Sequence, residues 1–174
     1  MIRLDRLAVS VLVAGILVAL TPVYADAAPI LKPYRWPSST VYVENHAGKR
    51  WPVRKAAENL DNGSSLDLVV VGKCPAGKPC IRVYGVGSIP GSAVGRTSSV
   101  VSDGRILSST VTLDNGWGKS RSRRWRTKTV CHELGHAVGL EHSASRRGTC
   151  MRIGYRKVAP SLSKSDRRAL NRVY

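Results

Sequence analysis

Three histidines in the C-terminal half constrain the fold of this chain more than any other feature. His132 and His136 are four residues apart, and His142 follows six residues later. On an α-helix, residues four apart lie one turn apart on the same face, so the first two imidazoles could reach one metal ion. Gly139 can adopt the left-handed conformation that ends a helix, and a turn there could return His142 to the same ion. The pattern therefore predicts a helix that ends sharply beside a metal site.

The residue types in this segment indicate zinc. Neutral imidazole binds Zn²⁺ at about 2.0–2.1 Å, and three protein ligands leave a fourth position for water, as in catalytic sites. Glu133 follows His132 directly, where its carboxylate could reach such a water without binding the ion. The alternative is a helix with incidental histidines, but the five fixed positions match by chance with odds of only roughly one in ten thousand. We expect one catalytic zinc ion on His132, His136 and His142, with Glu133 as general base.

The first 25 residues are typical of an export signal. Two arginines precede an apolar run from Leu7 to Leu20, and the small-residue pattern Val23-Tyr24-Ala25 follows. A membrane anchor is the alternative, but the run is short for a span, which needs about 20 residues. We therefore expect a signal peptide over 1–25, cleaved after Ala25 or Ala27, and a secreted protein of bacterial origin with no transmembrane span.

Periodicity and turn residues predict the elements that follow. Residues 26–37 hold three prolines and are expected to form an extended lead-in. The expected elements are a strand at 40–43, a helix from Trp51 to Leu60, strands at 66–71 and 81–84, a loop at 85–95, a hairpin of strands 95–101 and 106–113, the motif helix starting within 124–129, and a last helix capped by Ser163. This order predicts one α+β (mixed α/β) domain over 38–174.

Four cysteines in an exported chain indicate two disulfides. Cys74 and Cys80 bracket a tight segment and are natural partners, which leaves Cys131 and Cys150. A zinc cluster of cysteines is the alternative, but the wide and irregular spacing argues against it.

The formal net charge of +17 favours anionic surroundings such as acidic proteins or a cell-wall polyanion. A solvated surface kept soluble by charge repulsion explains the same charge equally well. The basic run from Lys119 to Lys128 could bind a polyanion, with Trp125 stacking on a base or a sugar. The alternative for this run is an exposed loop followed by the first turn of a helix.

The segment from His132 to His142 resembles the metzincin zinc endopeptidases, which share the pattern His-Glu-x-x-His-x-x-Gly-x-x-His and a Met-turn. Met151 lies nine residues after His142, where the resemblance places the Met that underlies the zinc without binding it. Among metzincins the chain looks most like the matrixins. In those, a Tyr four residues after the Met helps wall the pocket for the substrate side chain after the scissile bond, and Tyr155 has that spacing. Ile153 stands where the family usually has Pro.

This resemblance implies a twisted, mostly parallel sheet with an antiparallel edge strand, an active-site helix, a Met-turn and a C-terminal helix. It also implies hydrolysis of peptide bonds in a protein or peptide substrate that pairs with an exposed edge strand. By order in the chain, Gly95 to Val101 is the candidate for that edge. If the Met-turn packs beneath the helix, Cys131 and Cys150 could form a disulfide that joins the two.

Two other functions are compatible with the motif. A basic binding module could keep the zinc helix as a structural staple, but such a site needs no general base, so Glu133 favours an enzyme. A zinc hydrolase of cell-wall peptides would use the same chemistry on another substrate. His46 has no nearby histidine, so we expect an ordinary surface or strand residue there and no second zinc. Calcium is left open, because Asp and Glu are too sparse to indicate a cage. We expect a monomer.

Overall fold

Alternating apolar residues shape the strands of the computed structural model, which describes residues 31–143, 148–154 and 158–174. In the first strand, Val41 and Val43 are buried, whereas Tyr42 between them is only partly buried. The five strands are β1 (Thr40–His46), β2 (Asp67–Val71), β3 (Cys80–Val86), β4 (Gly95–Ser102) and β5 (Arg105–Asp114). The four helices of the described residues are α1 (Val53–Asp61), α2 (Asn115–Lys119), α3 (Arg123–Ala137) and α4 (Lys164–Leu170). The expected signal peptide and Tyr155 lie outside the described residues.

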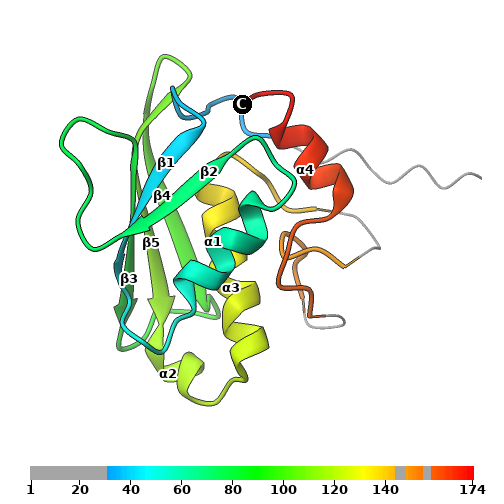
Figure 1. Cartoon of the computed structure of the whole chain (residues 1–174). Helices are drawn as coiled ribbons and strands as arrows, with labels where there is room; N and C mark the ends of the chain where they lie inside the picture. The colour runs from blue at the N-terminus through cyan, green and yellow to red at the C-terminus, as the bar shows by residue number, and fades with distance from the viewer. Residues whose placement is uncertain (1–30, 144–147, 155–157) are drawn as a thin grey trace, which may run out of the picture.

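The strands form one sheet in the order β2-β1-β3-β5-β4 (Figure 1). β1 pairs in parallel with β2 and β3, and β3 pairs in parallel with β5. β4 runs antiparallel to β5 and forms an edge of the sheet. Asp103 and Gly104 both have positive φ, at 50° and 70°, as a two-residue hairpin turn requires. The expected mostly parallel sheet with an antiparallel edge strand is confirmed, and the edge is the predicted segment.

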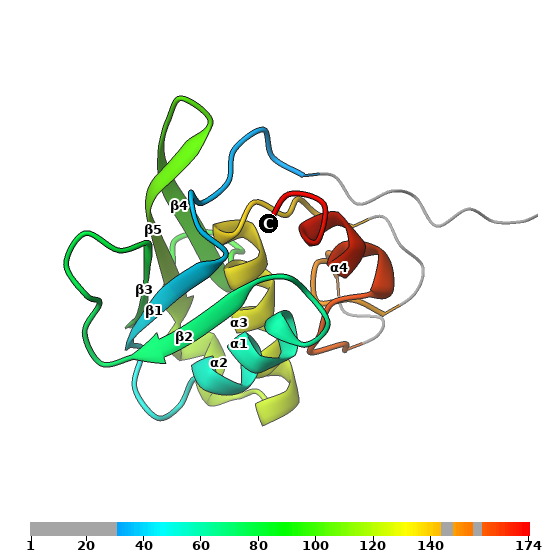
Figure 2. The same cartoon turned by 45° about the horizontal axis from the view of Figure 1, so that its top comes forward.

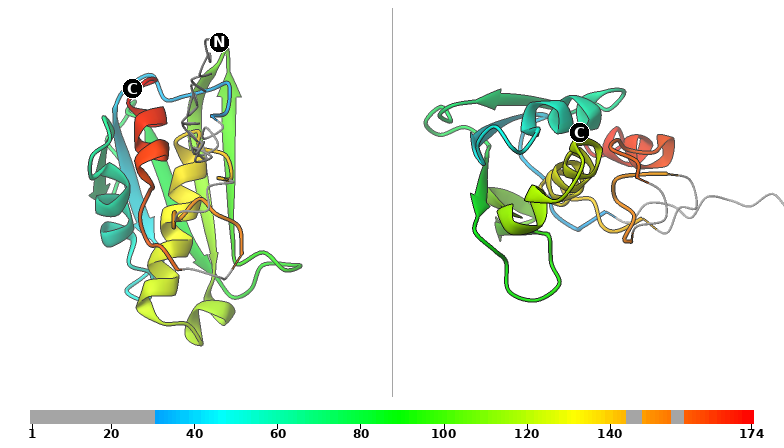
Figure 3. Two further views of the ribbon diagram at one scale, coloured as in Figure 1. Left: turned by 90° about the vertical axis from the view of Figure 1, so that its right-hand side faces the viewer. Right: turned by 90° about the horizontal axis from the view of Figure 1, so that it is seen from below.

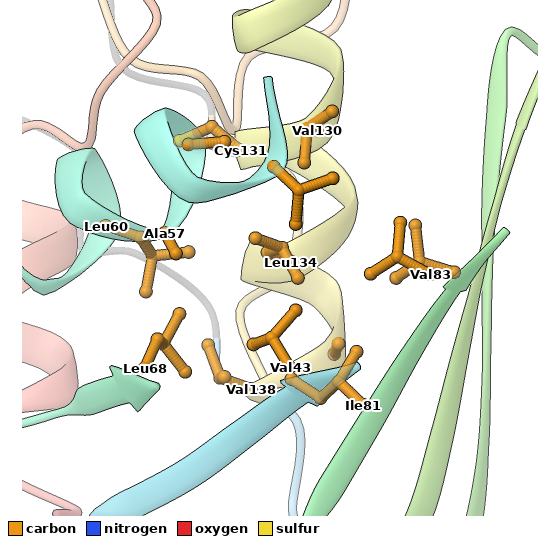
Figure 4. Packing of buried hydrophobic residues seen from close by; sticks show 14 of the residues in the cluster. Val43, Ala57, Leu60, Leu68, Ile81, Val83, Val130, Cys131, Leu134 and Val138 are labelled. Carbon is orange, nitrogen blue, oxygen red and sulfur yellow. The ribbon is translucent and has the colours of Figure 1, made fainter. Parts of the chain in front are cut away.

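The helices cover one face of this sheet, so the molecule has two main layers (Figures 2 and 3). Figure 4 shows the core between the layers, where side chains of α1 and α3 point towards the strands. The labelled core residues are Val43, Ala57, Leu60, Leu68, Ile81, Val83, Val130, Cys131, Leu134 and Val138. Burial on this scale fixes the position of α3 against the sheet, and with it the position of any residue that α3 presents.

Both ends of the described chain meet the C-terminal end of α3. The indole N–H of Trp36 donates to the carbonyl of Ala137 at 2.9 Å, and the hydroxyl of Tyr174 donates to the carbonyl of Val138 at 2.9 Å. Leu31 forms a β-bridge with Leu140. These bonds satisfy carbonyls that a helix end leaves without partners. The described part of the lead-in therefore packs against the domain.

Several local details differ from the expectations, and one is that β3 runs from Cys80 to Val86, into the expected loop at 85–95. α3 begins at Arg123, one residue before the expected range, because the side chain of Ser122 caps it by accepting from the backbone N–H of Trp125. α2 was not expected and is held by Asp114, whose carboxylate accepts from the backbone N–H of Trp117 at 2.8 Å. β1 continues three residues further than predicted, to His46. In the described ranges no helix is both long and apolar enough to cross a membrane.

Candidate metal centre

The two histidines of α3 are oriented by backbone carbonyls. His132 Nδ1 lies 2.8 Å from the carbonyl oxygen of Cys150, and His136 Nδ1 lies 2.7 Å from that of Leu140. A carbonyl oxygen can only accept, so each Nδ1 must carry the ring proton. The lone pair of each ring therefore sits on Nε2. The two Nε2 atoms are 3.2 Å apart and face one another.

His142 joins this pair because α3 ends where the sequence pattern predicts. Gly139 has φ of +96°, a conformation that side chains with a Cβ rarely adopt. Leu140 then donates its N–H back to the carbonyl of Gly135 at 2.9 Å, which turns the chain. The ring of His142 lies 5.1 Å from that of His132 and 4.7 Å from that of His136, between centroids. One ligand atom from each histidine lies within 4.8 Å of the other two.

This arrangement fits zinc. With both Nδ1 atoms protonated, neither Nε2 can donate to the other, so two lone pairs face each other at 3.2 Å and a cation is needed between them. Tetrahedral zinc with nitrogen ligands at about 2.0–2.1 Å places two nitrogens about 3.3 Å apart. Burial lowers the pKa of His132 to about 3 and also lowers the pKa of His136. Both imidazoles are therefore neutral at physiological pH, which is the form that binds metal.

Glu133 is buried beside the histidines and held by the edge strand. Its carboxylate Oε2 accepts from the hydroxyl of Thr97 at 2.7 Å. A Cβ at Gly95 would lie 2.6 Å from its Oε1, so only glycine lets β4 approach this closely. Burial raises the pKa of Glu133 to about 7, against the opposing effect of the Thr97 hydrogen bond. The protonation of this carboxyl group therefore changes near neutral pH.

Met151 lies directly against α3, at Gly135. It is fully buried, and a Cβ on Gly135 would lie 2.2 Å from its sulfur, so the helix and the Met-turn are in the closest contact that glycine permits. The structure pairs Cys131 with Cys150, and Cys74 with Cys80, as expected. Cys150 therefore serves twice, because its carbonyl also orients His132.

A cleft of about 280 Å³ opens beside the histidines. Its described lining comes from residues 92–95, one face of α3, Trp117 and residues 152–154, and it includes His132, Glu133 and His142. Two of its features were not anticipated. The contact between Thr97 and Glu133 joins residues 36 apart and has no signal in the sequence. Lys128 belongs to the basic run for which either polyanion binding or an exposed loop and first helical turn is expected, but it is only 8% exposed and lies on the face of α3 that lines the cleft.

His46 lies apart from this centre. Its ring stacks on that of Tyr84 at 4.9 Å between centroids, and its Nε2 lies 2.7 Å from a carboxylate oxygen of Glu44. It is an exposed residue of β1, as expected. Among the described residues, one other group has metal-ligand spacing, namely Glu44 with Cys74 and Cys80. Those two sulfurs are joined in a disulfide and cannot act as thiolate ligands.

Three histidines that converge at the wall of a cleft, with a buried carboxylate beside them, are the arrangement of a metal-dependent hydrolase. The particular family follows from its sequence. The family model described as Matrixin matches residues 47–174, and the chain belongs to the matrixins. It is therefore a zinc metalloendopeptidase, a hydrolase that acts on peptide bonds. A search of curated proteins found no match.

Proposed function

We propose that this matrixin is a secreted endopeptidase in which Glu133 is the general base and β4 holds the substrate. The observation that carries the proposal is the pair of facing Nε2 lone pairs, 3.2 Å apart, in the cleft that Glu133 also lines. His132, His136 and His142 would hold zinc, which supplies a Lewis acid that activates water and polarises the scissile carbonyl.

Glu133 would move the protons of the reaction. Its carboxylate would take a proton from the attacking water and deliver it to the leaving amine. The hydroxyl of Thr97 bonds one of its oxygens and so leaves the other for this exchange. The burial that raises the pKa of Glu133 to about 7 favours both halves of the transfer near neutral pH.

β4 is suited to align the substrate. Among the strands of the described residues it is an edge strand, so its outer N–H and C=O groups have no strand partner there and can pair with an extended peptide. Its first residue, Gly95, lies against Glu133. A peptide added to this edge would therefore pass the general base.

Secretion is supported by two independent features. Residues 1–25 have the composition of a signal peptide. The described domain holds two disulfides, which persist in oxidising compartments outside the cytosol.

Cleavage of casein by the purified mature protein tests this function. Glu133→Gln keeps an acceptor for Thr97 but cannot act as a base, and we expect a loss of activity of about 10²–10⁴-fold with zinc still bound. Glu141→Gln, which changes the neighbouring half-buried carboxylate, is the matched control and should retain activity. Chelation should abolish cleavage, and added zinc should restore it. Inertness of the wild-type protein while it holds one zinc ion per chain would refute general proteolysis.

A further inference from the structure

The cleft beside the histidines contains a cation that the proposed chemistry does not use. Lys128 precedes His132 by one helical turn and is only 8% exposed. Its Nζ donates to the carbonyl of Arg152 at 3.1 Å and lies 5.8 Å from the ring centroid of Trp125. It lines the cleft together with His132 and Glu133. The ammonium is therefore held in the cleft wall between α3 and the Met-turn.

This charge has no carboxylate partner within ion-pair distance among residues 31–143, 148–154 and 158–174. The acid of the described cleft lining is Glu133, whose charge attracts Lys128 from beyond ion-pair distance and whose carboxylate accepts from Thr97. Burying an ammonium is costly unless it is paired, and burial lowers the pKa of Lys128 accordingly. An ammonium has three N–H donors, so a carboxylate entering the cleft would add both a hydrogen bond and a counter-ion.

The other residues that line the cleft also suit an acidic side chain. The indoles of Trp117 and Trp125 provide apolar walls for a methylene stem. Arg152 supplies a second cationic residue to the lining. The net charge of +17 adds a long-range attraction for acidic chains.

We propose that the cleft selects an acidic side chain on the residue that follows the scissile bond, and that Lys128 is the residue that determines this specificity. The inference rests on the proposed function, because a side chain reaches this cleft only if the peptide lies along β4 with its scissile bond at the histidines. Four residues of helix separate Lys128 from His132 by about 6 Å along the axis. Glu is taken as the acidic residue of the test peptides.

Peptides that differ only in the residue after the scissile bond test the selectivity. The wild-type protein should cleave the Glu peptide with a kcat/KM roughly tenfold or more above that of the Gln peptide, as a charged hydrogen bond allows. Lys128→Met keeps the apolar stem and should bring the Glu to Gln ratio to about one, whereas Lys128→Arg should preserve it. Lys119→Met, an exposed residue of the same basic run, should leave the ratio unchanged. Equal cleavage of the Glu and Gln peptides by the wild type, or a ratio that survives in folded Lys128→Met, overturns the inference.

A binding measurement separates this inference from the proposed function. Peptides that begin with Glu or Gln represent the leaving fragment, and quenching of the emission of Trp117 and Trp125 reports their binding. Tighter binding of the Glu peptide by the wild type, lost in Lys128→Met, supports the inference even if no peptide is cleaved, which would refute only the proteolysis. Cleavage without any preference for Glu in either measurement refutes the selectivity alone.

Discussion

The two disulfides of this protein join residues in very different surroundings. Cys131–Cys150 is fully buried and connects α3 to the Met-turn, next to a histidine of the metal centre. Cys74–Cys80 closes a mostly exposed turn between β2 and β3, where Glu44 accepts from the backbone N–H of Cys74 at 3.1 Å. One bond is thus part of the support of the site, and the other secures a peripheral turn that has a second restraint.

This contrast teaches that several contacts between α3 and the Met-turn hold the metal centre together. The carbonyl of Cys150 orients His132, and Met151 packs against Gly135. The disulfide joins α3 to the Met-turn. A substitution between α3 and the Met-turn should therefore alter stability and metal binding together. A change on the side of β2 should alter stability alone.

The largest effect is expected from replacing Cys131 and Cys150 by Ala. Closing a loop of about 20 residues stabilises the fold by roughly 3 kcal/mol in the chain-entropy model, and that contribution would be lost. Because the disulfide holds the backbone carbonyl of Cys150 beside His132, its loss should let that carbonyl shift, and zinc affinity should fall about 10–100-fold. Urea unfolding and competition with a chelator measure the two effects. Unchanged zinc affinity in the folded variant would contradict the coupling.

A smaller loss is expected from Gly135→Ala. The added methyl would overlap the sulfur of Met151, which is fully buried. Overpacking of this kind costs about 1–3 kcal/mol, from which the higher helix propensity of Ala recovers up to about 1 kcal/mol.

Thermal unfolding should show a lower melting temperature, and zinc titration should show a lower affinity. Gly72→Ala, near the other disulfide, is the matched control, because nothing lies within 4 Å of its added Cβ. Equal effects of the two substitutions would show that the Met-turn does not constrain α3.

Replacing Cys74 and Cys80 by Ser should destabilise the protein by at most about 2 kcal/mol, because the loop is short. The hydrogen bond from Cys74 to Glu44 uses the backbone and should persist. Activity and zinc affinity should match the wild type in the same assays used for the other pair. A fall in zinc affinity here would contradict the separation of the two sides.

The smallest effect is a gain in stability from Asp61→Asn, on the same side as β2. Burial raises the pKa of Asp61 to about 6 from 3.8, so folding favours its protonated form. Its contribution to stability is therefore full below pH 4 and is lost as the pH rises through about 6. Asn keeps an acceptor for the N–H of Leu68 without the charge.

The variant should be more stable than the wild type at pH 7, by about 1 kcal/mol or less given the partial exposure of Asp61. At pH 4 the two should be nearly equal. Melting temperatures at both values check this, with activity as the control. A variant less stable at pH 7 than the wild type would show that the charged form is favoured in the fold.

Local patterns in the sequence were sufficient for much of this structure. The strands, the end of α3 at Gly139 and the cap of α4 depend on neighbouring residues, and each was predicted. Ser163 and Asp166 form the expected capping box, in which each side chain accepts from the other's backbone N–H. The mostly parallel sheet with an antiparallel edge strand agreed with the resemblance to the matrixins, which supplied information that periodicity alone lacks.

The missed features depend on residues far apart in the chain. The hydroxyl of Thr97 meets Glu133 only because β4 packs against α3. Trp36 is buried because the lead-in reaches the end of α3, and no local pattern indicates that partner. The five residues of α2 include two glycines, which disfavour a helix, and its cap depends on the end of β5. Lys128 is the exception, since its spacing of four from His132 places both on one face of a helix.

The open edge of β4 has a consequence for how the protein behaves at high concentration. An edge whose backbone can pair with one peptide can also pair with the same edge of a second copy, which is the usual start of aggregation through sheets. The strand has few large apolar residues, and the chain carries a net charge of +17 that makes two copies repel. Salt weakens that repulsion without closing the edge. Concentrated stocks in high salt are therefore the conditions in which this protein should lose solubility first.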